Sequence, residues 1–377
     1  MLMGKRPSDY DVATSATPQE VRSLFRRVIM VGAKFGVAIV VDRRRQIEVA
    51  TFRSDLSYSD GRRPDGVKYV SAREDALRRD FTINAMFYDP IAEQVVDYVG
   101  GRKDLHRRII RAVGDPQVRF SEDYLRMLRA VRFASGLGFR MAGSTEEAIR
   151  HRADRITQIS GERIREEMEK MLEDASAATA LRQMHQLGLL QAVLPELFAR
   201  EELWPAALRR VEAVAGRTGA LGTMAGLLCG LSKGDIRNII RRWGGSNSLR
   251  DSLCWLAEHL HDWKTLPEAS LAELKRALAH PNFRQLELLL RVEEKAATGR
   301  TASWRAIRGR ANRIDPAQVC PRPLLDGEEL KQVGLAESPR LGRILKQVYE
   351  AQLNERLTTR RDALRYALEL IGQERNK

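Results

Sequence analysis

The stretch "IIRAVGDPQVRFSEDYLRMLRAVRFASGLGF", residues 109–139, is where the sequence changes character. Before it stand short β-branched runs separated by turns, and from about residue 114 onward these strand signals fade. Within it, Ser121 is a good N-cap, and apolar Leu125, Leu128 and Val131 follow at helical spacing, which predicts a helix from Ser121 to about Gly136. The stretch therefore divides a small α/β part from a long helical part.

Upstream of this boundary, strands and helices alternate. Thr17, Pro18 and Glu20 combine a capping box with a proline at the first helical position, which predicts a helix over 18–27. Other segments read as strands because β-branched residues recur or alternate with polar ones. These segments are "DYDVA" (9–13), "VIMVGAKFGVAIVV" (28–41), "RQIEVATFR" (45–53) and a hairpin in "MFYDPIAEQVVDYV" (86–99).

Downstream, helical patterns continue to residue 372, the last of them spanning 340–372. The segment "RANRIDPAQVCPRP" (310–323) contains three prolines and is typical of a linker. We therefore expect an α+β fold with four parts, namely a head over 1–113, a helical neck over 114–175, a helical body over 176–309 and a helical tail over 310–377.

The overall charge indicates the class of partner. The chain has 377 residues and a formal net charge of +14, which favours a polyanion, nucleic acid before a membrane surface. Its three cysteines, Cys229, Cys254 and Cys320, are widely spaced and form neither a metal-ligand pattern nor a disulfide framework. No apolar run is long enough to span a bilayer. A reducing, cytoplasmic setting is expected.

Two aspartates, Asp9 and Asp11, stand two apart in a segment that reads as a strand, so both side chains should face the same way. Carboxylates so close repel each other unless a cation neutralises them, and hard oxygen ligands suit Mg²⁺. Such a pair can hold two metal ions ~4 Å apart for in-line attack on a phosphate. Glu48 is a third candidate ligand on a neighbouring strand. A solvated strand edge is the alternative interpretation of this pair, and an exposed strand residue that of Glu48.

Two longer motifs add context to these aspartates. They are "EDALRRDFTINAMFYDP" (74–90) and the opening stretch 109–139, and with "GLLQAVLPEL" (188–197) and "PLLDGEELKQVGLAESPRLGRIL" (323–345) they resemble the class II nucleotidyltransferases. This family comprises the CCA-adding tRNA nucleotidyltransferases and the related bacterial poly(A) polymerases. The resemblance implies a polymerase-β-like head followed by an elongated, all-helical neck, body and tail.

The resemblance also implies roles for individual residues. Asp9 and Asp11 match the catalytic metal-binding pair, and Arg78, Arg79 and Asp80 match a motif that binds the sugar and phosphates of a ribonucleotide. This is chemically sensible, because a carboxylate accepts a hydrogen bond from a ribose hydroxyl and a guanidinium grips phosphate. Asn84 is a supporting residue in the same run, for which a structural role is equally plausible.

Base recognition is implied for a second pair. Asp123 and Arg126, three apart on one expected helical face, match residues that read the Watson–Crick edge of the incoming base. A carboxylate accepts from the exocyclic amine of cytosine or adenine, and a guanidinium donates to a ring acceptor. Arg129 and Arg132 match further nucleotide-contacting arginines. The alternative interpretation is an ordinary amphipathic helix with acidic residues in its first turn.

The loop "RSDLSYSDGRRP" (53–64) resembles the flexible loop that helps CCA-adding enzymes change from C to A, with Asp60, Gly61, Arg62 and Arg63 as its clearest residues. A basic loop that touches the RNA backbone is the alternative. One family feature is missing from this sequence, a Gly-Gly-x-Val-Arg-Asp stretch before the paired aspartates. We therefore expect a head that lacks its first strand, through a start assigned too late, a truncation or a true loss.

The resemblance implies the expected function. It is addition of CCA, or of the terminal A alone, to tRNA 3′ ends from CTP and ATP, with Mg²⁺ as cofactor. A poly(A) polymerase of the same family and a catalytically inactive RNA-binding remnant are the alternatives.

Overall fold

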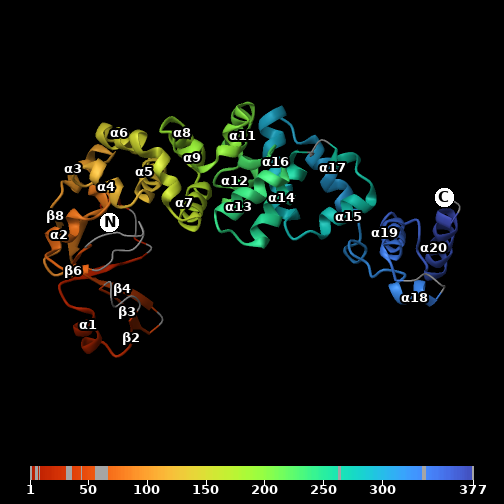
Figure 1. Ribbon diagram of the computed structural model, residues 1–377, viewed down its shortest axis with the longest axis horizontal. Helices are drawn as coiled ribbons and strands as arrows, with labels where there is room; N and C mark the ends of the chain where they lie inside the picture. The colour runs from red at the N-terminus through yellow and green to blue at the C-terminus, as the bar shows by residue number, and fades with distance from the viewer. Residues whose placement is uncertain are drawn as a thin grey trace. The chain divides into compact units, whose positions relative to one another are not determined.

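The computed structural model describes residues 2–4, 7, 9–30, 36–43, 45–55, 67–261, 265–332 and 337–375 (Figure 1). The chain forms two compact units, Met1–Leu208 with Arg237–Ser246, and Arg209–Ile236 with Asn247–Lys377. All strands of the described residues lie in the first unit, before residue 142, and the rest of the regular structure is helical. The predicted α+β class is thereby confirmed, whereas the division into four parts stays a prediction.

A four-stranded sheet opens the first unit. Its order is β1 (Val12–Thr14), β4 (Arg45–Thr51), β3 (Val37–Asp42) and β2 (Val28–Ile29), with β1 parallel to β4 and the other pairs antiparallel. Helix α1 (Pro18–Leu24) begins with the predicted capping box and packs Val21 against the sheet. It ends before the predicted residue 27 because Phe25 is already extended.

The segment before β1 differs from the prediction. Strand β1 begins at Val12, so Asp9 and Asp11 precede the strand instead of lying in it, and both are exposed. The carboxylate of Asp9 accepts a hydrogen bond from the backbone N–H of Tyr10 at 2.8 Å. Such a local bond competes with strand pairing, which accounts for the late start of β1.

Two hairpin-like pairs follow the sheet. Strands β5 (Arg53–Asp55) and β6 (Val67–Tyr69) pair antiparallel, and β7 (Met86–Asp89) with β8 (Gln94–Asp97) forms the predicted hairpin. Helix α3 (Gly101–Arg107) then packs against the short 3-10 helix η2 (Thr82–Asn84). The approach is so close that a Cβ on Gly101 would lie 2.2 Å from the carbonyl oxygen of Thr82. Gly101 therefore permits this contact.

The opening stretch contains two helices and not the predicted single one. Helix α4 (Pro116–Glu122) is capped by Asp115, whose carboxylate accepts from the N–H of Gln117, and α5 (Leu125–Leu137) follows after a break at Asp123. Asp115 followed by Pro116 starts a helix better than Ser121 does, because the aspartate is the cap and the proline is the first helical residue. The short parallel strands β9 (Ile109–Ile110) and β10 (Arg140–Met141) flank the two helices.

The helical part of the first unit packs around α5, which contacts α7 and α8. The core of this region contains Phe81, Phe120, Met127, Leu128 and Met168, each almost fully buried. The elements that follow α5 are α6 (Gly143–Arg152), η3 (Ala153–Gln158), α7 (Gly161–Glu173), α8 (Ala177–Gln186), α9 (Leu189–Val193), α10 (Pro195–Phe198), η4 (Glu201–Leu203) and α11 (Trp204–Val214).

The described part of the remaining chain is helical. Its elements are α12 (Gly219–Leu228), α13 (Lys233–Arg242), α14 (Asn247–His261), η5 (Leu266–Glu268), α15 (Leu271–Ala279), α16 (Phe283–Thr298), α17 (Ala302–Ala311), η6 (Pro316–Gln318), α18 (Gly327–Gln332), α19 (Pro339–Leu353) and α20 (Arg360–Arg375). The sequence pattern did not predict α17. Among the helices of the described residues, none has the length and apolar character needed to cross a membrane.

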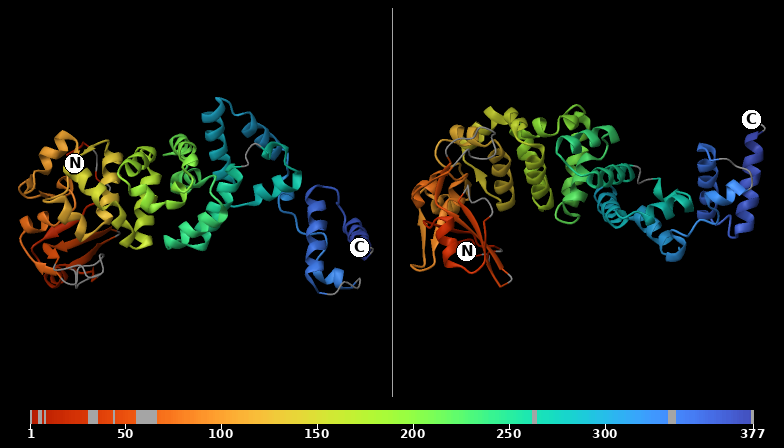
Figure 2. Two further views of the ribbon diagram at one scale, coloured as in Figure 1. Left: turned by 45° about the horizontal axis from the view of Figure 1, so that its top comes forward. Right: turned by 60° about the horizontal axis from the view of Figure 1, so that its bottom comes forward.

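The predicted helix over 340–372 is in fact two helices. Helices α19 and α20 lie side by side (Figure 2) and share a core with Leu325 and Leu330. The chain breaks between them because Glu355 takes a left-handed conformation with φ 60°, and Thr359 then accepts the N–H of Asp362 to start α20. Side chains that bond local backbone in this way end one helix and begin another.

Candidate nucleotide-binding site

The Arg78-Arg79-Asp80 motif lies at the end of a short, well-capped helix. Helix α2 (Ala72–Leu77) begins with a capping box between Ser71 and Glu74, and the hydrogen bonds from Ser71 lower the pKa of Glu74. The cap fixes where α2 begins, and the motif starts directly after the last residue of this helix.

A buried carboxylate, Asp75, holds both arginines of the motif. It accepts from Arg78 at 3.0 and 2.8 Å and from Arg79 at 3.3 Å, and the backbone N–H of Arg53 in β5 donates to it at 3.2 Å. Only 3% of the Asp75 side chain is exposed. Sequence reasoning missed this residue, although its spacing of three and four from the two arginines on a helix was a usable signal.

Asp80 connects the end of α2 with α5. Its carboxylate accepts from the Asn84 side-chain amide at 3.2 Å and from the Arg129 guanidinium at 2.8 and 2.7 Å. Burial acts to lower the pKa of Arg129, but the neighbouring carboxylates of Asp80 and Glu167 outweigh it and raise the pKa. The structure therefore brings three predicted residues, Asp80, Asn84 and Arg129, into direct contact.

Arg132 joins the same region through a residue that the sequence did not reveal. Its guanidinium donates to Glu167 of α7 at 2.6 Å, and Arg129 lies 3.8 Å from the same carboxylate. The ring of Phe133 lies beneath both guanidiniums, at 4.3 Å from Arg132 and 5.3 Å from Arg129. Glu167 is 35 residues from Arg132, so no local spacing could have indicated the pair.

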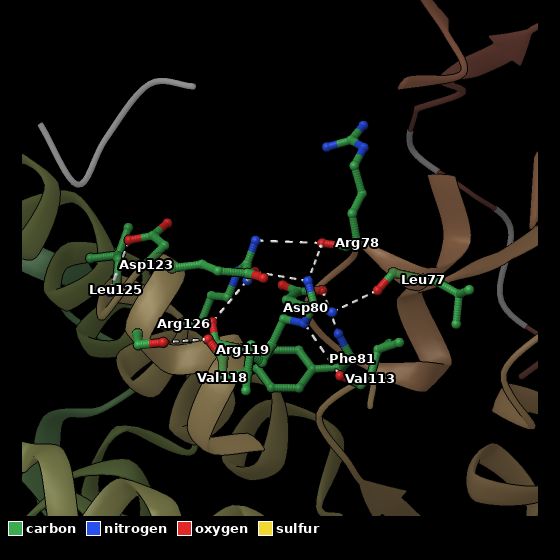
Figure 3. A network of polar contacts seen from close by, with 12 residues as sticks. Leu77, Arg78, Asp80, Phe81, Val113, Val118, Arg119, Asp123, Leu125 and Arg126 are labelled. Atoms are coloured by element: carbon green, nitrogen blue, oxygen red, sulfur yellow. Dashed lines mark hydrogen bonds and ion pairs between the residues drawn. The ribbon is translucent and has the colours of Figure 1, made fainter. Parts of the chain in front are cut away.

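The predicted base-reading residues do not share one helical face. Asp123 lies in the extended break before α5, with φ −155°, whereas Arg126 lies in the first turn of α5 (Figure 3). Asp123 accepts from Arg163 of α7 at 2.8 and 3.2 Å, while Arg126 donates to Glu122 at 2.5 Å and to the carbonyl oxygen of Arg119 at 2.8 Å. Asp123 and Arg126 are thus each oriented by a protein partner of their own.

Strand β1, which follows the paired aspartates, is joined to this site by a chain of contacts. The carbonyl oxygen of Thr14 in β1 accepts the N–H of Phe52, and the Phe52 ring meets Phe87 edge to face at 5.6 Å. The guanidinium of Arg79 lies over the same Phe87 ring at 4.9 Å. The strand that follows Asp11 is therefore packed towards the Arg78–Asp80 motif.

Glu48 lies in β4, the strand that pairs with β1. Val12 of β1 pairs with Val49 of β4, and Asp11 and Glu48 are the residues directly before these two. The carboxylates of Asp9, Asp11 and Glu48 are exposed, and the donor set is the hard oxygen type that Mg²⁺ prefers. Within the residues that the structure describes, no three Asp, Glu, His or Cys side chains are already grouped as a metal site. The loop residues Asp60, Gly61, Arg62 and Arg63 lie outside the described residues.

Comparisons with known proteins show what the chain is similar to. A family model described as "Poly A polymerase head domain" matches residues 1–111, and one described as "Probable RNA and SrmB- binding site of polymerase A" matches residues 138–200. The CCA-adding enzyme of Geobacillus stearothermophilus is 43% identical over 260 residues, which cover 67% of this chain and 61% of the relative. The CCA-adding enzyme of Geobacillus kaustophilus is 40% identical over 295 residues, which cover 74% of this chain and 70% of the relative.

Solved structures extend the similarity to the whole chain. The Bacillus stearothermophilus CCA-adding enzyme in complex with CTP has a TM-score of 0.80 and 32% identity, covering 100% of this chain and 92% of that one. The Thermotoga maritima CCA-adding enzyme complexed with tRNA has a TM-score of 0.63 at 18% identity, covering 98% and 88%, and shares the fold. The resemblance indicated by the motifs is confirmed, and the chain belongs to the family of CCA-adding enzymes, which are nucleotidyltransferases.

Proposed function

We propose that this chain adds CCA, or the terminal A alone, to the 3′ ends of tRNA from CTP and ATP. The observation that carries the proposal is the polar network that ties the Arg78–Asp80 motif to Arg126 and Arg129 of α5. It occurs in a chain that is 32% identical over its full length to a relative solved with CTP. The net charge of +14 suits a tRNA partner.

The proposed reaction is a nucleotidyl transfer. The 3′-hydroxyl oxygen of the tRNA forms a bond to the α-phosphorus of the nucleotide, the bond to the β-phosphate oxygen breaks, and pyrophosphate leaves while the hydroxyl proton passes to solvent. Asp9 and Asp11, with Glu48 as a third candidate, would hold Mg²⁺, which supplies Lewis-acid stabilisation to the attacking and leaving oxygens. Exposure of these carboxylates leaves them accessible to nucleotide and metal.

The nucleotide would be held by the network around Asp80. Arg79 reaches phosphate oxygens, and Asp80 accepts from a ribose hydroxyl while Arg129 and Asn84 keep its carboxylate in place. The backbone N–H of Phe81 donates to the same carboxylate at 2.8 Å, so a ribose hydroxyl would share one of its two oxygens with a donor already present. This arrangement favours ribonucleotides over deoxyribonucleotides.

The base would be read by Asp123 and Arg126. Asp123 accepts from the exocyclic amine of cytosine or adenine, and Arg126 donates to the adjacent ring nitrogen. Neither has to lose its protein partner, because the carboxylate keeps lone pairs and the guanidinium keeps N–H groups beyond those in use. A bidentate contact of this kind discriminates by roughly 1–3 kcal/mol. Uracil and guanine do not present the same donor and acceptor pattern.

Primer extension tests the proposal. The protein is incubated with Mg²⁺ and tRNAs that end at the discriminator base, at CC or at CCA, with CTP and ATP supplied separately and together. Extension of the first tRNA by C, C and A, with no extension of the third, establishes CCA addition. Extension only of the CC-ended tRNA by one A identifies an A-adding enzyme.

Two other outcomes would reject the proposal. Long A tails on any RNA would identify a poly(A) polymerase, and binding without extension would leave an inactive RNA-binding protein. We favour CCA addition over both, because the relatives described above are named CCA-adding enzymes. Cys229, Cys254 and Cys320, all among the described residues, form no disulfide, which suits the proposed reducing, cytoplasmic setting.

A further inference from the structure

Arg119, which the sequence did not single out, lies between the two nucleotide-binding motifs. Its guanidinium projects from α4 and is only 13% exposed. It donates to the carbonyl oxygens of Leu77 at 2.8 Å, Arg78 at 3.1 Å and Val113 at 3.2 Å, and to the Glu122 carboxylate at 2.8 Å (Figure 3). One side chain therefore bonds the end of α2 and the end of α4.

The bonds to Leu77 and Arg78 compensate for the end of α2. The last carbonyl groups of a helix have no partner within the helix, and its C-terminus carries a partial negative charge. Helix α2 has no basic residue in its own last turn. Arg119 supplies the missing positive charge and donors from another helix, 41 residues further along the chain.

The opposite side of the same network holds the base-reading side chain. Glu122 accepts from both Arg119 at 2.8 Å and Arg126 at 2.5 Å, and Arg126 donates to the carbonyl oxygen of Arg119 at 2.8 Å. Arg126 also reaches the carbonyl oxygen of Arg78 at 3.4 Å. The Arg78 carbonyl group therefore lies between Arg119 and Arg126, while the Arg78 guanidinium extends away from them (Figure 3).

We infer that Arg119 is a positioning residue for base selection, which holds the Arg78–Asp80 motif and the Asp123–Arg126 turn at a fixed separation. The inference rests on the proposed function and adds a residue to it. The ribose and the Watson–Crick edge of one nucleotide are a fixed distance apart, so two motifs that grip both must keep that distance. A misplacement of about 1 Å costs on the order of 100-fold in an oriented site.

The test uses R119M and R119K in the full chain. R119M keeps the aliphatic stem and removes every donor, whereas R119K keeps the charge and bonds fewer of the acceptors. The measured quantity is the ratio of kcat/KM for CTP to kcat/KM for UTP on a tRNA that ends at the discriminator base. We expect this ratio to fall roughly 10- to 100-fold in R119M, as for loss of hydrogen bonds to a charged group, and less in R119K.

Arg73 gives the matched control. It is an exposed arginine in the first turn of the same helix α2, far from the end that Arg119 caps. R73M should leave the ratio unchanged. Thermal unfolding of each variant shows whether it is folded. If R119M is not folded, the CTP-to-UTP ratio of R119K tests the inference in its place.

The outcomes separate the inference from the proposed function. A folded variant that loses rate equally for CTP and UTP would make Arg119 merely structural and overturn the inference. An unchanged ratio in a folded variant would overturn it as well. If the wild-type chain adds no nucleotide to any tRNA, the proposed function itself fails, whatever the variants do.

Discussion

The carboxylate of Asp123 is bonded to the guanidinium of Arg163, at 2.8 and 3.2 Å, and Arg126 is bonded to Glu122 instead. Arg163 belongs to α7, so the Asp123 carboxylate is oriented by a residue 40 positions further along the chain. The Arg163 and Asp123 side chains are largely shielded from solvent, with 18% and 15% of their surface exposed. The pair is therefore more than a surface salt bridge, because removing one partner would leave a shielded charge unpaired.

Replacement of Arg163 by Gln should loosen Asp123 and leave its charge without its guanidinium partner. We expect a lower CTP-to-UTP selectivity and an unfolding midpoint lower by a few degrees, since ~1 kcal/mol corresponds to ~2–4 °C in a chain of this order of size. R163K should retain part of the selectivity because the charge remains. The measurements are single-nucleotide kinetics and thermal unfolding, with Arg150→Gln of the exposed α6 pair as control. Equal selectivity in R163Q and the wild type would show that Asp123 needs no partner.

The Asp123–Arg163 pair shows which features of the structure the sequence could predict. Local signals were sufficient where a side chain bonds its own neighbourhood, as in the Thr17–Glu20 capping box and the β7–β8 hairpin. The motifs also indicated residues that the fold brings together, since Asn84 and Arg129 both contact Asp80. What a spacing rule could not supply was the partner from another helix.

Two errors have different causes. The spacing between Asp123 and Arg126 predicted one helical face, but the aspartate lies outside the helix and is held by Arg163. The single helix from Ser121 was wrong because the stronger Asp115–Pro116 start takes precedence locally. Glu167 and Arg119 act through tertiary contacts that no window of sequence contains.

The paired aspartates lead to a prediction about metal. If Asp9 and Asp11 hold Mg²⁺, then D9N or D11N should lower nucleotide transfer by a factor on the order of 10² to 10³, as for loss of one preorganised charge-stabilising group. Chelation of Mg²⁺ should abolish transfer by the wild type, and adding the ion back should restore it. Asp42→Asn, at the exposed end of β3, is the control and should transfer normally. Undiminished transfer by D9N and D11N would exclude these residues as ligands.

Asp97 leads to a prediction about pH. Partial burial acts to raise the pKa of Asp97, but hydrogen bonds from the backbone N–H groups of residues 99–102 outweigh it and lower the pKa below 3.8. Because the pKa is lower in the folded state, the ionised carboxylate stabilises the fold at any pH above the pKa of the unfolded state. This stabilisation is lost as the pH falls through the pKa of the folded state. The wild type should therefore unfold at a higher temperature than D97N at pH 7, with the difference shrinking below about pH 4. Thermal unfolding between pH 7 and 3.5 measures it, and a difference that grows in acid would contradict the assignment.

The close contact at Gly101 leads to a prediction about packing. An added Cβ would lie 2.2 Å from the carbonyl oxygen of Thr82 and 2.8 Å from Cγ of Met86, so G101A must push α3 away from η2. Overpacking of this kind costs typically ~1–3 kcal/mol, and the shift should also raise KM for CTP because Asn84 in η2 supports Asp80. Gly136→Ala is the matched control, since Gly136 lies on helix α5 with open space around its Cβ position and should become slightly more stable. The two variants are compared by thermal unfolding and nucleotide kinetics. Equal stability and equal KM in both would mean that the contact between α3 and η2 yields without disturbing Asp80.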